Sequence, residues 1–289
     1  MNKPFFTGVC TALVTPFLEN RVNYPMLEIL LQRQLEAGIR AIVLCGTTGE
    51  ASTLSDGEKI EMIRRGKNFV GKRCKIIAGT GSNDTSHAVR LSQAAESAGA
   101  DALLVVSPYY NKATQEGLVA HYRAIAGSVR IPVILYNVPS RTGLDVPVSV
   151  YQQLSLVPNI VGVKEANTDI RKIMKIRRTC SPDFAVWSGN DDMTVPIVSL
   201  GGRGVISVLS NVCPVEMAAM TNAALDGDFD SASALQLELD PLSEALFSEV
   251  NPIPVKAAMK LIGYDCGGCR LPLIELDQTN LQRLRELFR

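Results

Sequence analysis

Short apolar segments recur through the first three quarters of the chain, each followed by polar or glycine-rich residues and then by a stretch with helical periodicity. They show little polar alternation, which is typical of strands that are covered on both faces. Eight such segments can be recognised: GVCTALVTP (8–16), GIRAIVLCG (38–46), KIIAGTG (75–81), ADALLVVSP (100–108), PVILYNVP (132–139), NIVGVKEA (159–166), FAVWSG (184–189) and GVISVLS (204–210). The pattern predicts eight buried parallel strands.

The intervening segments carry apolar residues at i, i+3, i+4 and i+7, as in residues 24–38 and 85–100. This spacing is typical of helices that pack against a sheet. Strand–helix units repeated every roughly 20 to 35 residues imply right-handed parallel crossovers. Eight units predict an α/β fold, a closed (β/α)8 TIM barrel. A doubly wound open sheet usually has GxGxxG after its first strand, and TPFLENR (15–21) has no such motif.

The strand pattern ends near Leu225, and the sequence that follows is helical without strands, as in residues 229–250 and 254–263. We therefore expect a barrel over residues 1–225 and a C-terminal helical extension, residues 226–289, packed on it. The extension would serve oligomer contacts more than chemistry. No linker rich in proline or serine precedes it, so we expect no independently folding second domain.

The composition narrows the classes of function. The 29 basic and 29 acidic residues give no electrostatic reason to expect nucleic acid or an anionic membrane as a partner. No apolar run reaches the roughly 18 residues that a membrane span needs, and the N-terminus lacks the layout of a signal peptide. We expect a cytoplasmic protein that acts on small molecules.

The cysteines and histidines do not suggest a metal site. Seven cysteines are spread without a framework spacing, so reduced thiols are expected. Cys266 and Cys269 form a CxxC motif, but no second CxxC or histidine pair completes a zinc site. His87 and His121 also lack a useful spacing. We expect no metal, and the role of the CxxC motif stays open.

One lysine stands out at the end of a predicted strand, where barrels of this kind place their active sites. Lys164 follows the apolar run IVGV, and burial disfavours the charged form of an amine. A neutral lysine can attack a carbonyl carbon and form an imine. Side chains alternate along a strand, so Glu165 should face the other way, and a Lys164–Glu165 pair is the weaker explanation.

Other strand ends carry groups that would complement such a lysine. Tyr136 ends the neighbouring strand and could move protons, although a buried tyrosine is more often a core residue. The hydroxyls of Thr47 and Thr48 in GTTGE suit a small carboxylate, or they belong to a simple turn. Arg141 in PSRTG could hold a second carboxylate, or it is a surface arginine.

Five motifs together resemble a known family. In chain order they are GTTGE (46–50), PYYN (108–111), YNVPSRTG (136–143), VGVKEA (161–166) and SGND (188–191). The set is similar to the pyruvate-dependent class I aldolase, or N-acetylneuraminate lyase, superfamily, and specifically to its 4-hydroxy-tetrahydrodipicolinate synthase (dihydrodipicolinate synthase) branch. The resemblance covers about Phe6 to the last helices. It implies a lyase that condenses pyruvate with L-aspartate 4-semialdehyde in the diaminopimelate and lysine pathway, with no metal cofactor.

The resemblance also implies roles for individual residues. Lys164 matches the lysine that holds pyruvate as a Schiff base. The proton relay would comprise Tyr136, Thr47 and Tyr110, with Tyr110 reaching in from a neighbouring subunit. The substrate-binding positions would be Thr48 beside the pyruvate carboxylate, Arg141 at the mouth, and Gly189 and Ile206 lining the pyruvate pocket. A relay completed in trans requires at least a dimer, and family members are usually tetramers formed as dimers of dimers.

Some members of the family are inhibited by lysine. The positions that match their effector site are Ala51, Ser52, Asp56, Lys59, Asn83, His87 and Tyr109. This sequence departs from the lysine-sensitive pattern, with His87 in place of an acidic residue and Lys59 in place of a histidine. A cationic effector would meet a cation and an imidazole, so we predict weak or absent inhibition by millimolar lysine.

Two alternatives stay open at this point. The N-acetylneuraminate and 2-keto-3-deoxy sugar acid lyases share the lysine, the tyrosine and the GTTGE-type loop. They generally lack an arginine at the position of Arg141, and a neutral sugar aldehyde would leave that charge unpaired. The second alternative is a catalytically silent barrel, which the presence of every matched side chain argues against.

Overall fold

Eight parallel strands close a barrel in the computed structural model, which describes residues 4–288. The order round the barrel is β1-β10-β9-β8-β7-β6-β5-β4, so every neighbour is the next barrel strand along the chain and β1 closes on β10. The strands are β1 (Gly8–Ala12), β4 (Ala41–Leu44), β5 (Lys75–Gly79), β6 (Ala102–Val106), β7 (Val133–Asn137), β8 (Ile160–Glu165), β9 (Ala185–Ser188) and β10 (Gly204–Ser207). All eight strands predicted from the apolar segments are present, and the predicted TIM barrel is confirmed.

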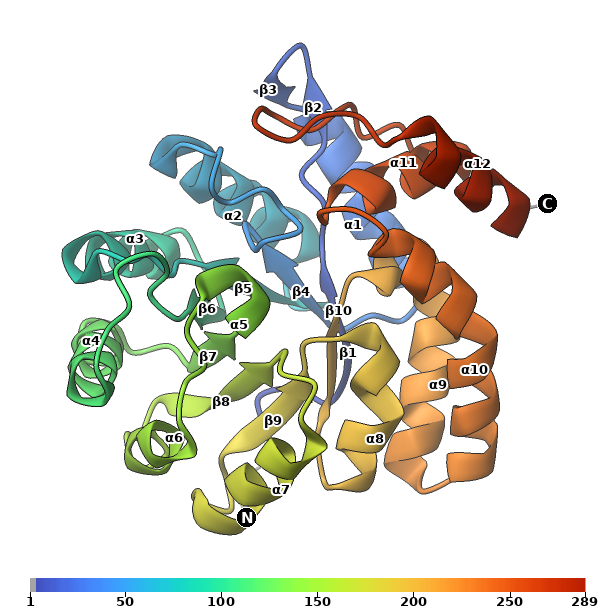
Figure 1. The fold of residues 1–289 in the computed structure, drawn as a ribbon. Helices are drawn as coiled ribbons and strands as arrows, with labels where there is room; N and C mark the ends of the chain where they lie inside the picture. The colour runs from blue at the N-terminus through green and yellow to red at the C-terminus, as the bar shows by residue number, and fades with distance from the viewer. Residues whose placement is uncertain (1–3, 289) are drawn as a thin grey trace.

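Helices surround the barrel and follow its strands in turn (Figure 1). They are α1 (Tyr24–Glu36), α2 (Asp56–Val70), α3 (Thr85–Ser97), α4 (Gln115–Gly127), α6 (Val148–Leu154), α7 (Ile170–Thr179), α8 (Thr194–Ser199) and α9 (Pro214–Asp226). Polar side chains fix where several of them begin. Ser55, for example, accepts a hydrogen bond from the backbone N–H of Glu58, whose carboxylate in turn accepts from the N–H of Ser55.

Alternation along the strands separates two apolar layers. One fills the barrel and includes Ile134, Ile206 and Trp187, with Phe6 stacked on the indole at a ring-centroid distance of 4.6 Å. The other lies between the strands and the helices and is the larger core. Gly162 is needed where β8 meets β9, because a Cβ there would lie 2.3 Å from the carbonyl oxygen of Ala185.

Shorter elements lie at the rim of the barrel. Strands β2 (Phe17–Leu18) and β3 (Arg21–Val22) form a small antiparallel ribbon, and α5 (Pro139–Thr142) follows β7. The 3₁₀ turns η1 (Asp191–Met193) and η2 (Leu209–Asn211) follow β9 and β10. These elements come after the carboxyl ends of strands, where the candidate side chains were expected.

Three helices follow the last barrel unit: α10 (Phe229–Leu246), α11 (Ile253–Leu261) and α12 (Gln278–Leu287). Helix α10 packs against α8 and α9, and α11 and α12 pack against each other and against α10. Figure 1 shows the loop between α11 and α12 crossing beside the β2–β3 ribbon, where the N–H of Phe17 donates to the carbonyl of Cys266. Within residues 4–288, none of the helices has the length and hydropathy to cross a membrane.

Candidate active site

Lys164 and Tyr136 are direct neighbours on adjacent strands. They are paired in the register of β7 and β8, and the Nζ atom of Lys164 lies 4.4 Å from the centroid of the Tyr136 ring. Both side chains are buried, with 4% and 6% of their surface exposed. Tyr136 belongs to the apolar cluster inside the barrel. The lysine singled out in the sequence therefore lies at the end of the barrel interior, beside the tyrosine expected to assist it.

Glu165 faces away from Lys164, as the alternation along the strand predicts. Its fully buried carboxylate accepts hydrogen bonds from Asn137 Nδ2 (2.7 Å) and Tyr151 Oη (3.0 Å), and it lies 3.4 Å from Lys172 Nζ. Burial raises the pKa of Glu165, and the charge of Lys172 opposes that rise. Glu165 is therefore satisfied on the outer side of the barrel and does not neutralise Lys164.

The turn after β4 carries Thr47 and Thr48. Thr47 is half-buried and its carbonyl accepts a hydrogen bond from the N–H of Glu50, while Thr48 is buried. The Oγ1 atom of Thr48 accepts from Nδ2 of Asn251, which precedes α11. Residue 251 lies in the C-terminal extension, which therefore contacts the turn that carries both threonines.

The remaining predicted substrate positions also lie at strand ends. Gly189 follows β9, and a Cβ there would lie 2.7 Å from the Cβ of Ala166, so a larger residue would push the loops apart. Ile206 is fully buried on β10 inside the barrel. Arg141 lies on α5, exposed, with Nη2 3.4 Å from the carbonyl oxygen of Asn251. Its guanidinium is thus available to a ligand.

A cavity of about 580 Å³ lies at this end of the barrel. Thr47, Tyr136, Arg141 and Asn251 line it. Backbone hydrogen bonds hold two parts of the lining: β7 is paired with β8, and within the turn after β4 the N–H of Ala51 donates to the carbonyl of Gly46. The cavity brings together a phenol, a hydroxyl and a guanidinium, which are groups that can bind carboxylate and carbonyl oxygens.

Most of the predicted effector positions line the same cavity: Ala51, Ser52, Asp56, Lys59, His87 and Tyr109. Asp56 is the centre of this group, with His87 Nε2 at 2.9 Å and Lys59 Nζ at 3.8 Å. Asn83 lies beside it and donates to the carbonyl of Tyr109 at 3.1 Å. Two basic side chains therefore already share the carboxylate of Asp56, and weak lysine inhibition stays a prediction.

Tyr110 does not join the other members of the predicted relay within one chain. It follows β6 with a φ of +71°, a left-handed conformation that is uncommon for a residue other than glycine. Its side chain is 92% exposed. A role in a neighbouring subunit, as the resemblance implies, stays a prediction.

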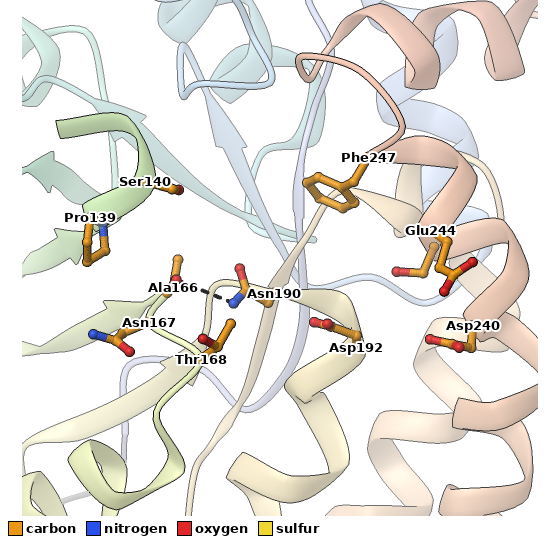
Figure 2. A pocket seen from close by; sticks show the side chains of 11 residues that line it. Pro139, Ser140, Ala166, Asn167, Thr168, Asn190, Asp192, Asp240, Glu244 and Phe247 are labelled. Atoms are coloured by element: carbon orange, nitrogen blue, oxygen red, sulfur yellow. Dashed lines mark hydrogen bonds between the residues drawn. The ribbon is translucent and has the colours of Figure 1, made fainter. Parts of the chain in front are cut away.

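A second cavity, of about 530 Å³, lies between loops at the ends of barrel strands and helix α10 (Figure 2). The loops after β7, β8 and β9 form one wall, where Asn190 Nδ2 donates to the carbonyl of Ala166. Helix α10 forms the other wall with Asp240 and Glu244. Asp192 lies between the two walls. Burial raises the pKa of Asp192, and the charge of Asp240 adds to the rise, while hydrogen bonds from backbone N–H groups oppose it. The sequence pattern did not predict this acidic cavity.

Asp191 was also missed, although it ends the SGND motif. Its buried carboxylate accepts hydrogen bonds from the N–H groups of Val208 and Leu209, both at 3.0 Å, and so ties the loop after β9 to the turn after β10. Burial raises the pKa of Asp191, and the rise is opposed first by a hydrogen bond from Ser207, then by the N–H groups of Leu209 and Val208 and last by the charge of Lys164. The available signal was a carboxylate in the short polar segment that follows a strand, three residues after Ser188.

The CxxC motif lies in the loop between α11 and α12. Burial raises the pKa of Cys266 to about 12 and that of Cys269 to about 11, which disfavours the thiolate form that redox chemistry and metal binding require. In the part of the chain that the structure describes, all the cysteines are free thiols. No group of three potential ligands positioned to hold a metal ion occurs in residues 4–288.

Comparison with known proteins gives one consistent result. The sequence profile of the Dihydrodipicolinate synthetase family matches residues 5–289. The 4-hydroxy-tetrahydrodipicolinate synthase of Acetivibrio thermocellus is 50% identical over 289 residues, which is 100% of this chain and 98% of that protein. The crystal structure of dihydrodipicolinate synthase from Aquifex aeolicus superposes with a TM-score of 0.96 at 43% identity, covering 98% of this chain and 97% of the other.

A third comparison concerns a liganded enzyme. The chloride-inhibited dihydrodipicolinate synthase of Acinetobacter baumannii, solved in complex with pyruvate, is 42% identical and has a TM-score of 0.95. The match covers 97% of each chain. The similarity therefore extends over whole chains, including the helices after the barrel.

Proposed function

The chain belongs to the dihydrodipicolinate synthetase family and is a lyase of the 4-hydroxy-tetrahydrodipicolinate synthase type, and from this premise we propose that Lys164 carries the reaction as an imine with pyruvate. The observation that carries the proposal is the placement of a buried lysine next to a buried tyrosine. An amine in this setting has a proton-transferring phenol beside it. No metal or organic cofactor has a part in the proposal.

In the first half of the reaction, Nζ of Lys164 attacks the keto carbon of pyruvate and forms a carbinolamine. Loss of water from this carbon gives the imine, and both steps require proton transfer to and from oxygen. Tyr136, which lies beside Lys164, and Thr47 both line the cavity and are proposed to move these protons, with Tyr110 of a second subunit as the third member of the relay. Thr48, Gly189 and Ile206 are proposed to hold the pyruvate.

In the second half, the imine draws electrons from the methyl carbon, which loses a proton and becomes an enamine. The enamine carbon attacks the aldehyde of L-aspartate 4-semialdehyde and forms the new carbon–carbon bond. The amino group of the same substrate can then displace Lys164 at the imine carbon, which closes the ring and restores the free lysine. Arg141 is proposed to hold the carboxylate of the semialdehyde at the cavity mouth.

The proposed assembly is a homotetramer made of two tight dimers. The exposed Tyr110 and the half-exposed Tyr109 beside it support the dimer within this assembly, because a second copy would cover them and bring Tyr110 to a neighbouring cavity. Sedimentation velocity would test this assembly. A monomer that turns over at full rate would contradict a relay completed in trans.

Two experiments test the activity. A coupled assay should show pyruvate consumption that depends on L-aspartate 4-semialdehyde, and little turnover with neutral sugar aldehydes. Borohydride added with pyruvate should give a stable adduct mapped to Lys164. Turnover with sugar aldehydes alone would favour a sugar acid lyase, and an absence of both turnover and adduct would contradict the proposal.

A further inference from the structure

Glu50 ends the GTTGE turn in an unusual backbone conformation. Its φ is +55°, in the left-handed region that residues other than glycine rarely adopt, and its side chain is buried. Cys45, at the start of the same turn, has a φ of +56°. Strained residues persist only where the surrounding structure holds them in place.

The groups that bind the Glu50 carboxylate come from the C-terminal extension. Lys256 Nζ on α11 lies 2.8 Å from one oxygen, and the backbone N–H of Arg270 donates to the other at 2.9 Å. Lys256 also donates to the carbonyl of Gly268 at 2.8 Å and is 3% exposed. The ion pair of Glu50 and Lys256 is thus buried, and each side chain also has a hydrogen bond to a backbone group. The pair links segments more than 200 residues apart in sequence.

The same turn carries the two threonines of the proposed site. The N–H of Glu50 donates to the carbonyl of Thr47 at 3.0 Å, so the position of Glu50 sets that of Thr47. Asn251 donates to the hydroxyl of Thr48 at 3.0 Å, again from the C-terminal extension. A further bond, from Thr15 Oγ1 to the carbonyl of Gly49, holds the turn against the segment that follows β1. The extension therefore contacts the turn at two points next to the cavity.

We propose that Lys256 is a positioning residue for the reaction: through Glu50 it holds Thr47 and Thr48 where they meet the imine on Lys164. This inference rests on the proposed function, because it assigns the turn to that site. The physical reason is that a buried carboxylate stays in place when a buried ammonium binds it. Displacement of a proton-transferring group by about 1 Å can lower a rate about 10²-fold.

The test separates positioning from stability with three variants. Lys256→Met leaves the Glu50 carboxylate buried and unpaired, so it should lower both the melting temperature and kcat. The double variant Glu50→Gln with Lys256→Met leaves no unpaired buried charge and should recover most of the melting temperature. Lys260→Met is the matched control, because Lys260 lies on the same helix but is exposed and pairs only with Asp265 at the surface.

The deciding measurement is kcat of the double variant, together with the rate at which it forms the borohydride-trapped adduct with pyruvate. We expect both to be at least about tenfold below wild type, with Lys260→Met unchanged. A double variant with wild-type kcat would overturn the inference. A double variant that fails to fold would also overturn it, because the pair would then act through stability alone. Wild-type enzyme that forms no adduct would instead refute the proposed function.

Discussion

Asn137 donates a hydrogen bond to Glu165 at 2.7 Å on the outer side of the barrel, immediately after Tyr136 and Lys164 on the inner side. The two pairs follow each other in the register of β7 and β8, so the outer bond fixes the inner pair. Asn137 also donates to Asp145 and accepts from the N–H of Val146. The alignment of Lys164 with Tyr136 is therefore held by polar contacts on the outer side of the barrel, away from the cavity.

Replacement of Asn137 by alanine should destabilise the protein. It leaves the buried Glu165 without its nearest donor, and an unsatisfied buried polar group costs about 1–3 kcal/mol. Urea unfolding would measure the loss, with Gln282→Ala as the control, since Gln282 is exposed and bonds only to Glu286. An unchanged unfolding midpoint for Asn137→Ala would contradict this account of the strand register.

Tyr136→Phe should lower kcat about 10²- to 10⁴-fold, the usual contribution of a positioned acid–base group. The ring packs inside the barrel, so phenylalanine keeps the packing and removes only the hydroxyl. Adduct formation with pyruvate should become slow without being lost. Steady-state kinetics and quenched trapping would measure both, and a variant within twofold of wild type would exclude Tyr136 from proton transfer.

Arg141→Ala should raise KM for L-aspartate 4-semialdehyde and leave KM for pyruvate nearly unchanged. A hydrogen bond to a charged group contributes about 1.5–3 kcal/mol, which corresponds to a roughly 10- to 150-fold change. Because Arg141 is exposed, we expect the lower part of this range. Arg64→Ala is a control, with its side chain 53% exposed and paired to Glu61. Equal changes in both KM values would argue against a specific role.

Glu58 should make stability depend on acid pH. A hydrogen bond from Arg270 holds the pKa of Glu58 at about 2, below its ordinary value of 4.5. The unfolded chain therefore takes up this proton first, so the contribution is complete above about pH 4.5 and is lost as the pH falls through about 2. Glu58→Gln should be less stable near neutral pH but lose less stability below about pH 4.5. If the free energy of unfolding, measured in urea, fell equally with pH for both proteins across this range, the lowered pKa of Glu58 would be contradicted.

Much of the fold could be predicted from the sequence because each barrel strand is an unbroken apolar segment bounded by polar residues. The same regularity made Lys164 conspicuous in the sequence, because lysine is rarely buried and here it ends a segment that is otherwise apolar. Alternation then correctly placed Glu165 on the opposite face. These inferences depend only on neighbours in sequence or on the known geometry of parallel barrels.

The parts that sequence reasoning missed depend on contacts between distant segments. Lys256 and Asn251 bind the GTTGE turn from more than 200 residues away, and nothing in their local sequence indicates this. The acidic cavity joins Asp192 on the barrel to Asp240 on α10, which likewise requires the packing of helices. The β2–β3 ribbon has two residues in each strand, too few for a periodic signal.

The central claim is that Lys164 forms an imine with pyruvate, and trapping it by reduction tests this most directly. Wild-type protein treated with pyruvate and borohydride should gain the mass of one reduced pyruvate per chain, mapped by peptide analysis to Lys164. Lys164→Ala should gain none while keeping the circular dichroism spectrum of the barrel. An adduct of equal yield in Lys164→Ala, or its absence from active wild-type enzyme, would contradict the account.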